Sequence, residues 1–309
     1  MRGIFYNSKQ SLCSIWESGK MCYEALKNSN NYTLEYSEEE TMDFSYDFAI
    51  FNHHFTVNRW ISNEIINKFK KPTFCIVTEV SFNSNPIEFS PNYFSHYIVL
   101  DPTIKETKNI HGFIRPIEDF DLSTVDNTKI DYNIPNIFSF GFATIGKEWH
   151  KIVELVQNDY DKANIHFNIP KGTYVPDYLH NNEIERIKKN CKNIIKKPGI
   201  ILKITNDNLS KQEIIKLCST STINCFFYIR EHIFVSGLAA VTDQAIASGR
   251  PLFITSDRTF RHIHKYIDYY PNISIKEAIE NNQKGVLKMK EEWTRKEFLK
   301  KFEKILLQI

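Results

Sequence analysis

Short apolar runs alternate with amphipathic stretches along the first half of the chain. Strands are predicted where β-favouring residues cluster between polar segments, at 3–6, 32–36, 48–51, 73–78 and 97–100. Helices are predicted at 14–27 and 59–69, where apolar positions recur at helical spacing. Strands that alternate with helices in this way are typical of a parallel sheet with helices on both faces. The pattern therefore predicts an α/β fold.

A polar, acidic stretch interrupts this pattern between 116 and 135 and is the best candidate for a linker. A second series of strands follows at 137–140, 163–167, 200–204, 222–228 and 252–254. Its helices are predicted at 147–157, 182–192, 211–218 and 242–247. We therefore expect two α/β domains, at 1–132 and 133–285.

The tail at 286–309 is predicted to be helical. Apolar residues recur near i, i+4 spacing in its last part, at Phe298, Phe302, Ile305 and Leu306. One face of this helix should therefore be buried.

Charge and composition narrow the class of protein. The 309 residues include 39 Lys and Arg against 37 Asp and Glu, for a net charge of +2, which argues against a dedicated nucleic-acid binder. The six cysteines show no CxxC spacing, so we expect a reducing compartment and neither a zinc site nor a disulfide framework. The N-terminus has no signal-peptide pattern, and no apolar run approaches a transmembrane length. We expect a cytoplasmic protein, with at most a peripheral contact at the inner membrane face.

The segment 228–264 carries most of the information about function. Its sequence predicts a strand end, a polar loop, a small-residue helix, a Gly-Arg-Pro stop, a second strand and a second polar loop. In open α/β sheets, ligands bind at strand carboxyl ends and helix N-termini. We therefore expect this segment to hold part of a ligand.

Two segments resemble the donor domain of nucleotide-sugar-dependent GT-B glycosyltransferases. They are FSFGFATIGKEWHKIVELV at 138–156 and SGLAAVTDQAIASGRPLFIT at 236–255. The first half of the chain matches that family only in layout. The resemblance implies a GT-B-like fold, with two Rossmann-like domains facing each other across a cleft. The donor would bind to 133–285 and the acceptor to 1–132, and the last helix would cross back to the first domain.

The chain departs from the family at specific positions. Retaining members carry two glutamates with seven positions between them, and the aligned positions here hold Ser236 and Gln244. The family's arginine after the first glycine is replaced by Phe142, whereas the lysine is present as Lys147.

For the ribose diol of a donor, the resemblance implies a carboxylate or an amide. Asp243 at the start of a helix is the first candidate, followed by Gln244 and Glu231. The plainer interpretation of Asp243 is an acidic residue that complements the helix dipole.

For the diphosphate, we expect backbone N–H groups around Ser236 and Gly237 together with cations. The cationic candidates are Lys147, Arg230 and, in the second polar loop, Arg258. Each could equally be an ordinary solvated charge. Gly141 either permits a close approach to the ligand or is a simple turn glycine. In the second polar loop, either the arginines face an anionic donor or acceptor, or the loop only supplies Ser256 or Asp257 as a cap for the next helix.

Candidate catalytic residues follow two predicted strands of the first half. His53 and His54 come after 48–51, and Glu79 comes after 73–78. An inverting transferase needs a general base for the acceptor hydroxyl, whereas a retaining one chiefly needs electrostatic stabilisation of the leaving diphosphate. The plainer interpretation is local hydrogen bonding at polar strand ends.

These observations predict a glycosyltransferase that moves a sugar from a nucleotide-sugar to a hydroxyl of a cell-surface glycan or another glycoconjugate. No metal and no cofactor beyond the co-substrate are expected, because no DxD-type pair stands out as a magnesium site and no P-loop motif occurs. Two alternatives stay open. One is a degenerate, non-catalytic binding or scaffold protein, and the other is a sugar-nucleotide epimerase on the same fold.

Overall fold

The computed structural model describes residues 1–9, 14–54, 58–81, 85–88, 90–125, 130–172, 175–229 and 235–309. The chain divides into two compact units. Unit 1 consists of Met1–Glu118, Ile233–Leu238 and Glu292–Ile309, and unit 2 consists of Asp119–His232 and Ala239–Glu291. Residues 119–132, which we assigned to the first domain, are thus counted with unit 2.

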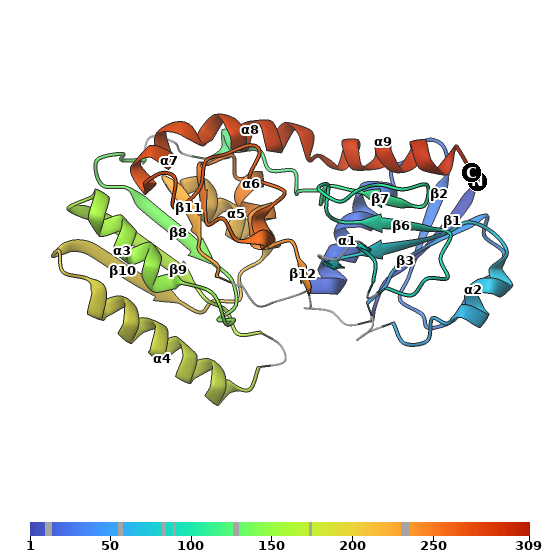
Figure 1. Cartoon of the computed structure of the whole chain (residues 1–309), viewed down its shortest axis with the longest axis horizontal. Helices are drawn as coiled ribbons and strands as arrows, with labels where there is room; N and C mark the ends of the chain where they lie inside the picture. Colours follow the sequence, from blue (N-terminus) through green and yellow to red (C-terminus); the bar gives the residue numbers. More distant parts are fainter. Residues whose placement is uncertain are drawn as a thin grey trace. The chain divides into compact units, whose positions relative to one another are not determined.

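Unit 1 is built on a parallel sheet in the order β2-β1-β3-β4-β6-β7 (Figure 1). Its strands are β1 (Arg2–Tyr6), β2 (Thr33–Ser37), β3 (Phe48–Asn52), β4 (Thr73–Val77), β6 (His96–Val99) and β7 (Ile110–Gly112). Its helices are α1 (Ser14–Leu26), α2 (Asn63–Phe69) and α9 (Arg295–Leu306). A separate antiparallel pair joins β5 (Glu79–Ser81) to β12 (Val235–Gly237).

Successive side chains along the strands of unit 1 point to opposite faces of the sheet, and each face carries its own apolar core. On β3, Phe48 and Ile50 belong to one cluster, whereas Ala49 and Phe51 belong to the other. Both faces are apolar because the sheet is covered on both sides. The tail helix α9 contributes to the first cluster, and its buried residues are the four predicted from the spacing, Phe298, Phe302, Ile305 and Leu306.

Unit 2 is built on a second parallel sheet, in the order β10-β9-β8-β11-β13. Its strands are β8 (Asn136–Phe140), β9 (Lys162–Asn168), β10 (Gly199–Thr205), β11 (Ile223–Phe226) and β13 (Leu252–Ile254). Its α-helices are α3 (Trp149–Asp159), α4 (Asp177–Ile194), α5 (Lys211–Thr220), α6 (Val241–Ala247), α7 (Ile275–Asn281) and α8 (Gln283–Glu292). The described residues of the unit also form the 3-10 turns η1 (Leu122–Thr124) and η3 (Arg258–Phe260).

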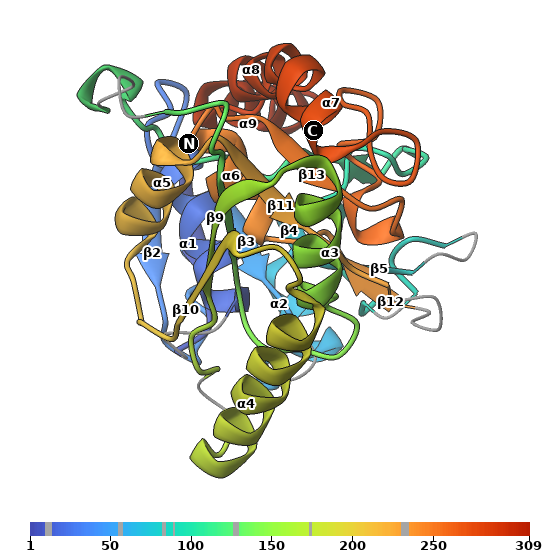
Figure 2. The same cartoon turned by 90° about the vertical axis from the view of Figure 1, so that its left-hand side faces the viewer.

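The helices α3 and α4 pack against each other and cover one face of the second sheet (Figure 2). The core on this face joins Ile152 of α3 and Ile187 of α4 to Ile165 of β9. The α/β class predicted from the sequence is therefore confirmed, with one parallel sheet in each unit.

Candidate functional site

Gly141 follows β8 at the carboxyl edge of the sheet of unit 2. Its φ of +124° lies outside the range that other residues adopt readily. A Cβ atom at this position would lie 2.6 Å from Nζ of Lys147 and 3.1 Å from Cγ1 of Val241, the first residue of α6. Glycine here lets the ammonium group of Lys147 approach the backbone at the end of β8.

Two aromatic rings hold the side chain of Lys147 in this position. Its Nζ lies 5.2 Å from the ring centroid of Tyr228 and 5.7 Å from that of Trp149. The backbone supports the same arrangement, because Lys147 forms an isolated antiparallel bridge with Tyr228. Lys147 thus lies in the turn before α3, not within the helix as the predicted range 147–157 implied. Sequence reasoning did not identify the two rings, and only the tertiary structure brings Tyr228 beside the lysine.

Asp243 lies in the first turn of α6 and is 3% exposed. The next residue, Gln244, is half-buried, and its Oε1 is buried without a hydrogen-bond partner within the described ranges. The neighbouring Thr242 donates from Oγ1 to the carbonyl of Ala239 at 2.7 Å, which fixes the start of the helix. The predicted contact of Asp243 or Gln244 with a ribose stays a prediction.

The second polar loop begins with a cap. Oδ1 of Asp257 accepts hydrogen bonds from the backbone N–H and the hydroxyl of Thr259, at 2.9 and 2.7 Å. The interpretation of Asp257 as a capping residue is therefore confirmed. Arg258 is exposed at the start of η3, and its predicted contact with an anionic ligand stays a prediction.

The other residues that we predicted to bind the donor do not lie beside Lys147 among the described residues of unit 2. Arg230 and Glu231 are outside the described residues. Ser236 and Gly237 lie in β12 of unit 1, opposite Val80 and Glu79 of β5, and not in a loop of the second domain. This difference arises because their backbone finds its ladder partners in β5. A Cβ atom at Gly237 would lie 2.8 Å from the carbonyl oxygen of Thr78, so glycine permits this close pairing.

The structure brings His54 and Glu79 together at the carboxyl edge of the sheet of unit 1. Nε2 of His54 lies 3.4 Å from Oε2 of Glu79, with the side chains 10% and 46% exposed. His53 directly precedes His54 in the sequence, and its ring centroid lies 6.0 Å from that of Phe94. Burial, and to a lesser extent the charge of His54, lowers the pKa of His53 to about 4. His53 is therefore uncharged at neutral pH.

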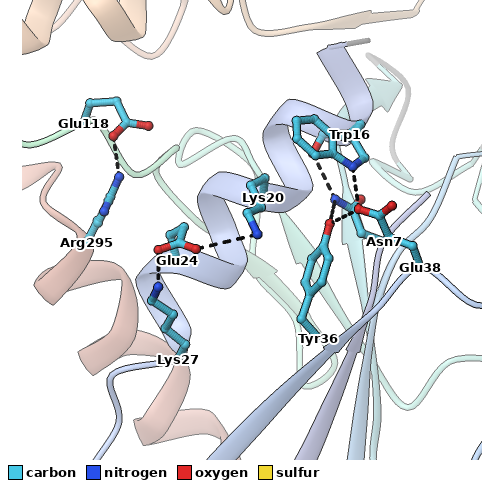
Figure 3. Close-up of polar contacts among 9 residues, drawn as sticks. All are labelled: Asn7, Trp16, Lys20, Glu24, Lys27, Tyr36, Glu38, Glu118 and Arg295. Atoms are coloured by element: carbon cyan, nitrogen blue, oxygen red, sulfur yellow. Dashed lines mark hydrogen bonds and ion pairs between the residues drawn. The ribbon is translucent and has the colours of Figure 1, made fainter. Parts of the chain in front are cut away.

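A polar network that we did not predict lies at the same edge (Figure 3). Asn7 follows β1 and donates from Nδ2 to the carbonyl of Trp16 at 3.1 Å and to the hydroxyl of Tyr36 at 3.0 Å. Glu38 accepts from Nε1 of Trp16 at 2.8 Å and from the hydroxyl of Tyr36 at 2.6 Å. Asn52, at the end of β3, donates to Oδ1 of Asn7 at 2.7 Å. A polar residue directly after each predicted strand was the signal that could have revealed this network.

A cavity of about 380 Å³ opens beside Lys147 in unit 2. It is lined by the connection from β8 to α3 and by one side of α4. Polar side chains in its wall contact one another, since His150 lies 3.3 Å from Glu148 and Arg186 lies 2.5 Å from Glu183. Within the described ranges, no cluster of three or more His, Cys, Asp or Glu side chains could hold a metal ion. None of the described helices is both long enough and apolar enough to cross a membrane.

Comparisons with solved structures give matches over the full length of the chain. HepE of Anabaena in complex with UDP is 7% identical, covers 100% of both chains and has a TM-score of 0.66. Trehalose-6-phosphate synthase OtsA is 9% identical, covers 100% of this chain and 99% of its own, and has a TM-score of 0.65. An E. coli trehalose-6-phosphate structure bound with UDP-2-fluoro glucose matches with 9% identity, the same coverage and a TM-score of 0.63.

No protein-family model and no curated protein matches the sequence. At these identities the likeness concerns the fold alone. The chain therefore has the GT-B fold of structures such as HepE and trehalose-6-phosphate synthase, as the resemblance of its second half predicted.

Proposed function

We propose that this protein is a glycosyltransferase that moves a sugar from a nucleotide-sugar donor to an acceptor hydroxyl without a metal ion. The observation that carries the proposal is the arrangement of Lys147 against Gly141 at the carboxyl end of β8. A cation held there, beside the first residue of α6, suits the diphosphate of a donor. The full-length fold likeness to structures holding UDP or a UDP-sugar supports UDP-sugars as the first donors to test.

In this proposal the residues of unit 2 stabilise the leaving group. As the bond between the sugar and the diphosphate breaks, negative charge grows on the phosphate oxygens, and the ammonium of Lys147 offsets it. The rings of Trp149 and Tyr228 hold that ammonium in place, so the lysine side chain needs little rearrangement during the reaction.

The residues of unit 1 act on the acceptor. Glu79 orients the ring of His54 through the 3.4 Å contact, and a ring nitrogen of His54 then takes the proton of the attacking hydroxyl. His53 is uncharged at neutral pH because burial lowers its pKa, so it can accept a hydrogen bond from a hydroxyl. An acceptor hydroxyl on a glycan or another glycoconjugate fits this chemistry.

Calorimetric titration of UDP, GDP, CMP and their sugars tests the proposal. We expect binding of one nucleotide class and a loss of about 10- to 100-fold in affinity for Lys147→Met, because a charge-assisted contact is removed. Lys188→Met is the matched control, since Lys188 forms only a surface pair with Glu185 on α4. A folded protein that binds none of these compounds would contradict the proposal. Product analysis without an acceptor separates a transferase from an epimerase.

A further inference from the structure

The sheet of unit 2 ends in a strand that nothing in the described part of the chain pairs on its outer side. β10 is the first strand in the order β10-β9-β8-β11-β13, and its one partner there is β9. It runs for seven residues, GIILKIT, without proline. An exposed edge of this length and apolar content is a template for pairing with another strand.

The other edges of the two large sheets are shorter or protected. β7 and β13 have three residues each, and β2 has five and carries Glu35, which forms an ion pair with Arg2. Lys301 of α9 also donates to the carbonyl of Gly112 in β7. β10 therefore stands apart as the long edge that the described residues leave open.

The direction of the backbone groups on β10 follows from two hydrogen bonds. The carbonyl of Thr205 accepts a hydrogen bond from the backbone N–H of Ile169, which follows β9. The backbone N–H and C=O groups of the odd-numbered residues of β10 therefore point toward β9. The N–H of Ile200 donates instead to Lys197, on the far side. Because successive residues point to opposite sides, Ile200, Leu202 and Ile204 direct their backbone groups outward.

The strand is self-complementary in one register. With Leu202 on a two-fold axis, the whole of Gly199–Thr205 pairs with the same strand of a second copy, antiparallel. Leu202 of each copy then exchanges two backbone hydrogen bonds with Leu202 of the other copy. The N–H of Ile204 in each copy also donates to the carbonyl of Ile200 in the other copy. These are the groups that point outward, so the register satisfies them without moving the strand.

The side chains fit the same register. Ile201 is 61% exposed, and Lys203 is exposed on the same face. In the antiparallel pair each Ile201 lies opposite Lys203 of the second copy, so the two lysines do not face each other. The alkyl stem of lysine can cover an apolar neighbour while its charge stays in water. On the other face, Leu202 and Ile204 are only partly buried against the core of unit 2 and would be covered further.

We propose that this protein forms a two-fold homodimer through antiparallel pairing of β10 with β10 of a second copy, which joins two five-stranded sheets into one. The proposal is independent of the enzymatic function. It places Leu202 on the symmetry axis and makes Ile201 and Lys203 neighbours across the interface.

Sedimentation velocity of the full chain over a range of concentrations tests the dimer and its register. Ile201→Glu places a carboxylate opposite Lys203 of the second copy and should lower the dimer dissociation constant by about 5-fold. Ile201→Lys places two lysines opposite each other and should raise it by a similar factor. Leu307→Glu is the matched control, because Leu307 is 63% exposed at the end of α9 in unit 1 and should leave the constant unchanged.

Hydrogen exchange supplies a second readout that does not depend on variants. The amides of Leu202 and Ile204 should become protected as the protein concentration rises, whereas the amide of Ile201, which faces β9, stays protected throughout. A wild-type protein that is monomeric at all concentrations would overturn the proposal. So would a dimer that responds in the same direction to Ile201→Glu and Ile201→Lys.

Discussion

Single residues set the geometry of the candidate donor site, and Gly141 is the clearest case. Gly141→Ala places a Cβ atom in a backbone with φ of +124° and 2.6 Å from Nζ of Lys147. We expect the free energy of unfolding to fall by about 1–3 kcal/mol, measured by urea denaturation, and nucleotide affinity to fall as Lys147 is displaced. Gly172→Ala is the control, because the nearest atom to its new Cβ would lie at 3.4 Å, an ordinary contact. Equal stability of the two variants would contradict the strain that we expect at position 141.

His53 makes the stability of the protein depend on pH. Its pKa is about 4 in the folded state, lowered chiefly by burial, against an ordinary value of 6.5. Between these values the unfolded chain binds a proton that the folded chain excludes, so the free energy of unfolding falls as pH drops from about 6.5 toward 4. The contribution of His53 is roughly 1–3 kcal/mol.

Urea titrations at several pH values measure this slope. In His53→Phe the dependence between pH 4 and 6.5 should become shallower, because the titrating ring is gone and the site remains apolar. A slope that is identical in the variant would mean that other groups cause it. His96 and His111 are candidates, since burial also lowers the pKa of each.

The residue types of the candidate sites were visible in the sequence, but their partners were not. His54 and Glu79 were both predicted as strand-end residues, and their 3.4 Å contact depends on how the strands that precede them, β3 and β4, pair. The network around Asn7 was missed because Trp16 and Tyr36 come from other elements. Periodicity shows where a strand ends, but it does not show which side chains meet there.

At the scale of elements, the tail helix α9 supplies an essential part of the core of unit 1. Phe302 is fully buried, and its ring centroid lies 5.0 Å from that of Phe74 and 6.0 Å from that of Tyr32. An ion pair between Arg295 at the start of α9 and Glu118 adds to this attachment (Figure 3).

Phe302→Ala should lower the free energy of unfolding by about 3–5 kcal/mol, because it removes a ring and leaves a cavity. Thermal and urea unfolding measure the loss. Leu307→Ala, at the C-cap of the same helix, should change the stability by less than about 0.5 kcal/mol since that side chain is mostly exposed. A small effect of Phe302→Ala would mean that α9 contributes little to the core.

Several elements coincide closely with their predicted ranges, whereas three short strands were not predicted. The predicted strand at 252–254 coincides with β13, and the predicted helix at 242–247 differs from α6 by one residue. The strands β5, β7 and β12 were missed, because three residues carry little periodicity, whereas the equally short β13 was recognised from the Gly-Arg-Pro stop before it. For β5 and β12 the stabilising hydrogen bonds also come from a segment more than 150 residues away.

At the scale of the whole molecule, the sequence by itself determined the α/β class, the order of most elements and the buried face of the tail helix. Alternating apolar runs and helical spacing are local properties, so they can be read without knowledge of distant partners. The resemblance of the second half to GT-B donor domains likewise rested on local order of loop, acid, small-residue helix and Gly-Arg-Pro.

Only the tertiary structure decided what lies beside what. It placed Ser236 and Gly237 in a strand of unit 1 and set Lys147 between two rings and against Gly141. Among the described residues, it also left the outer side of β10 without a partner strand. Each of these depends on pairing between segments far apart in the chain. Such pairing is settled by the packing of the whole sheet and its hydrogen bonds, and no local pattern in the sequence encodes it.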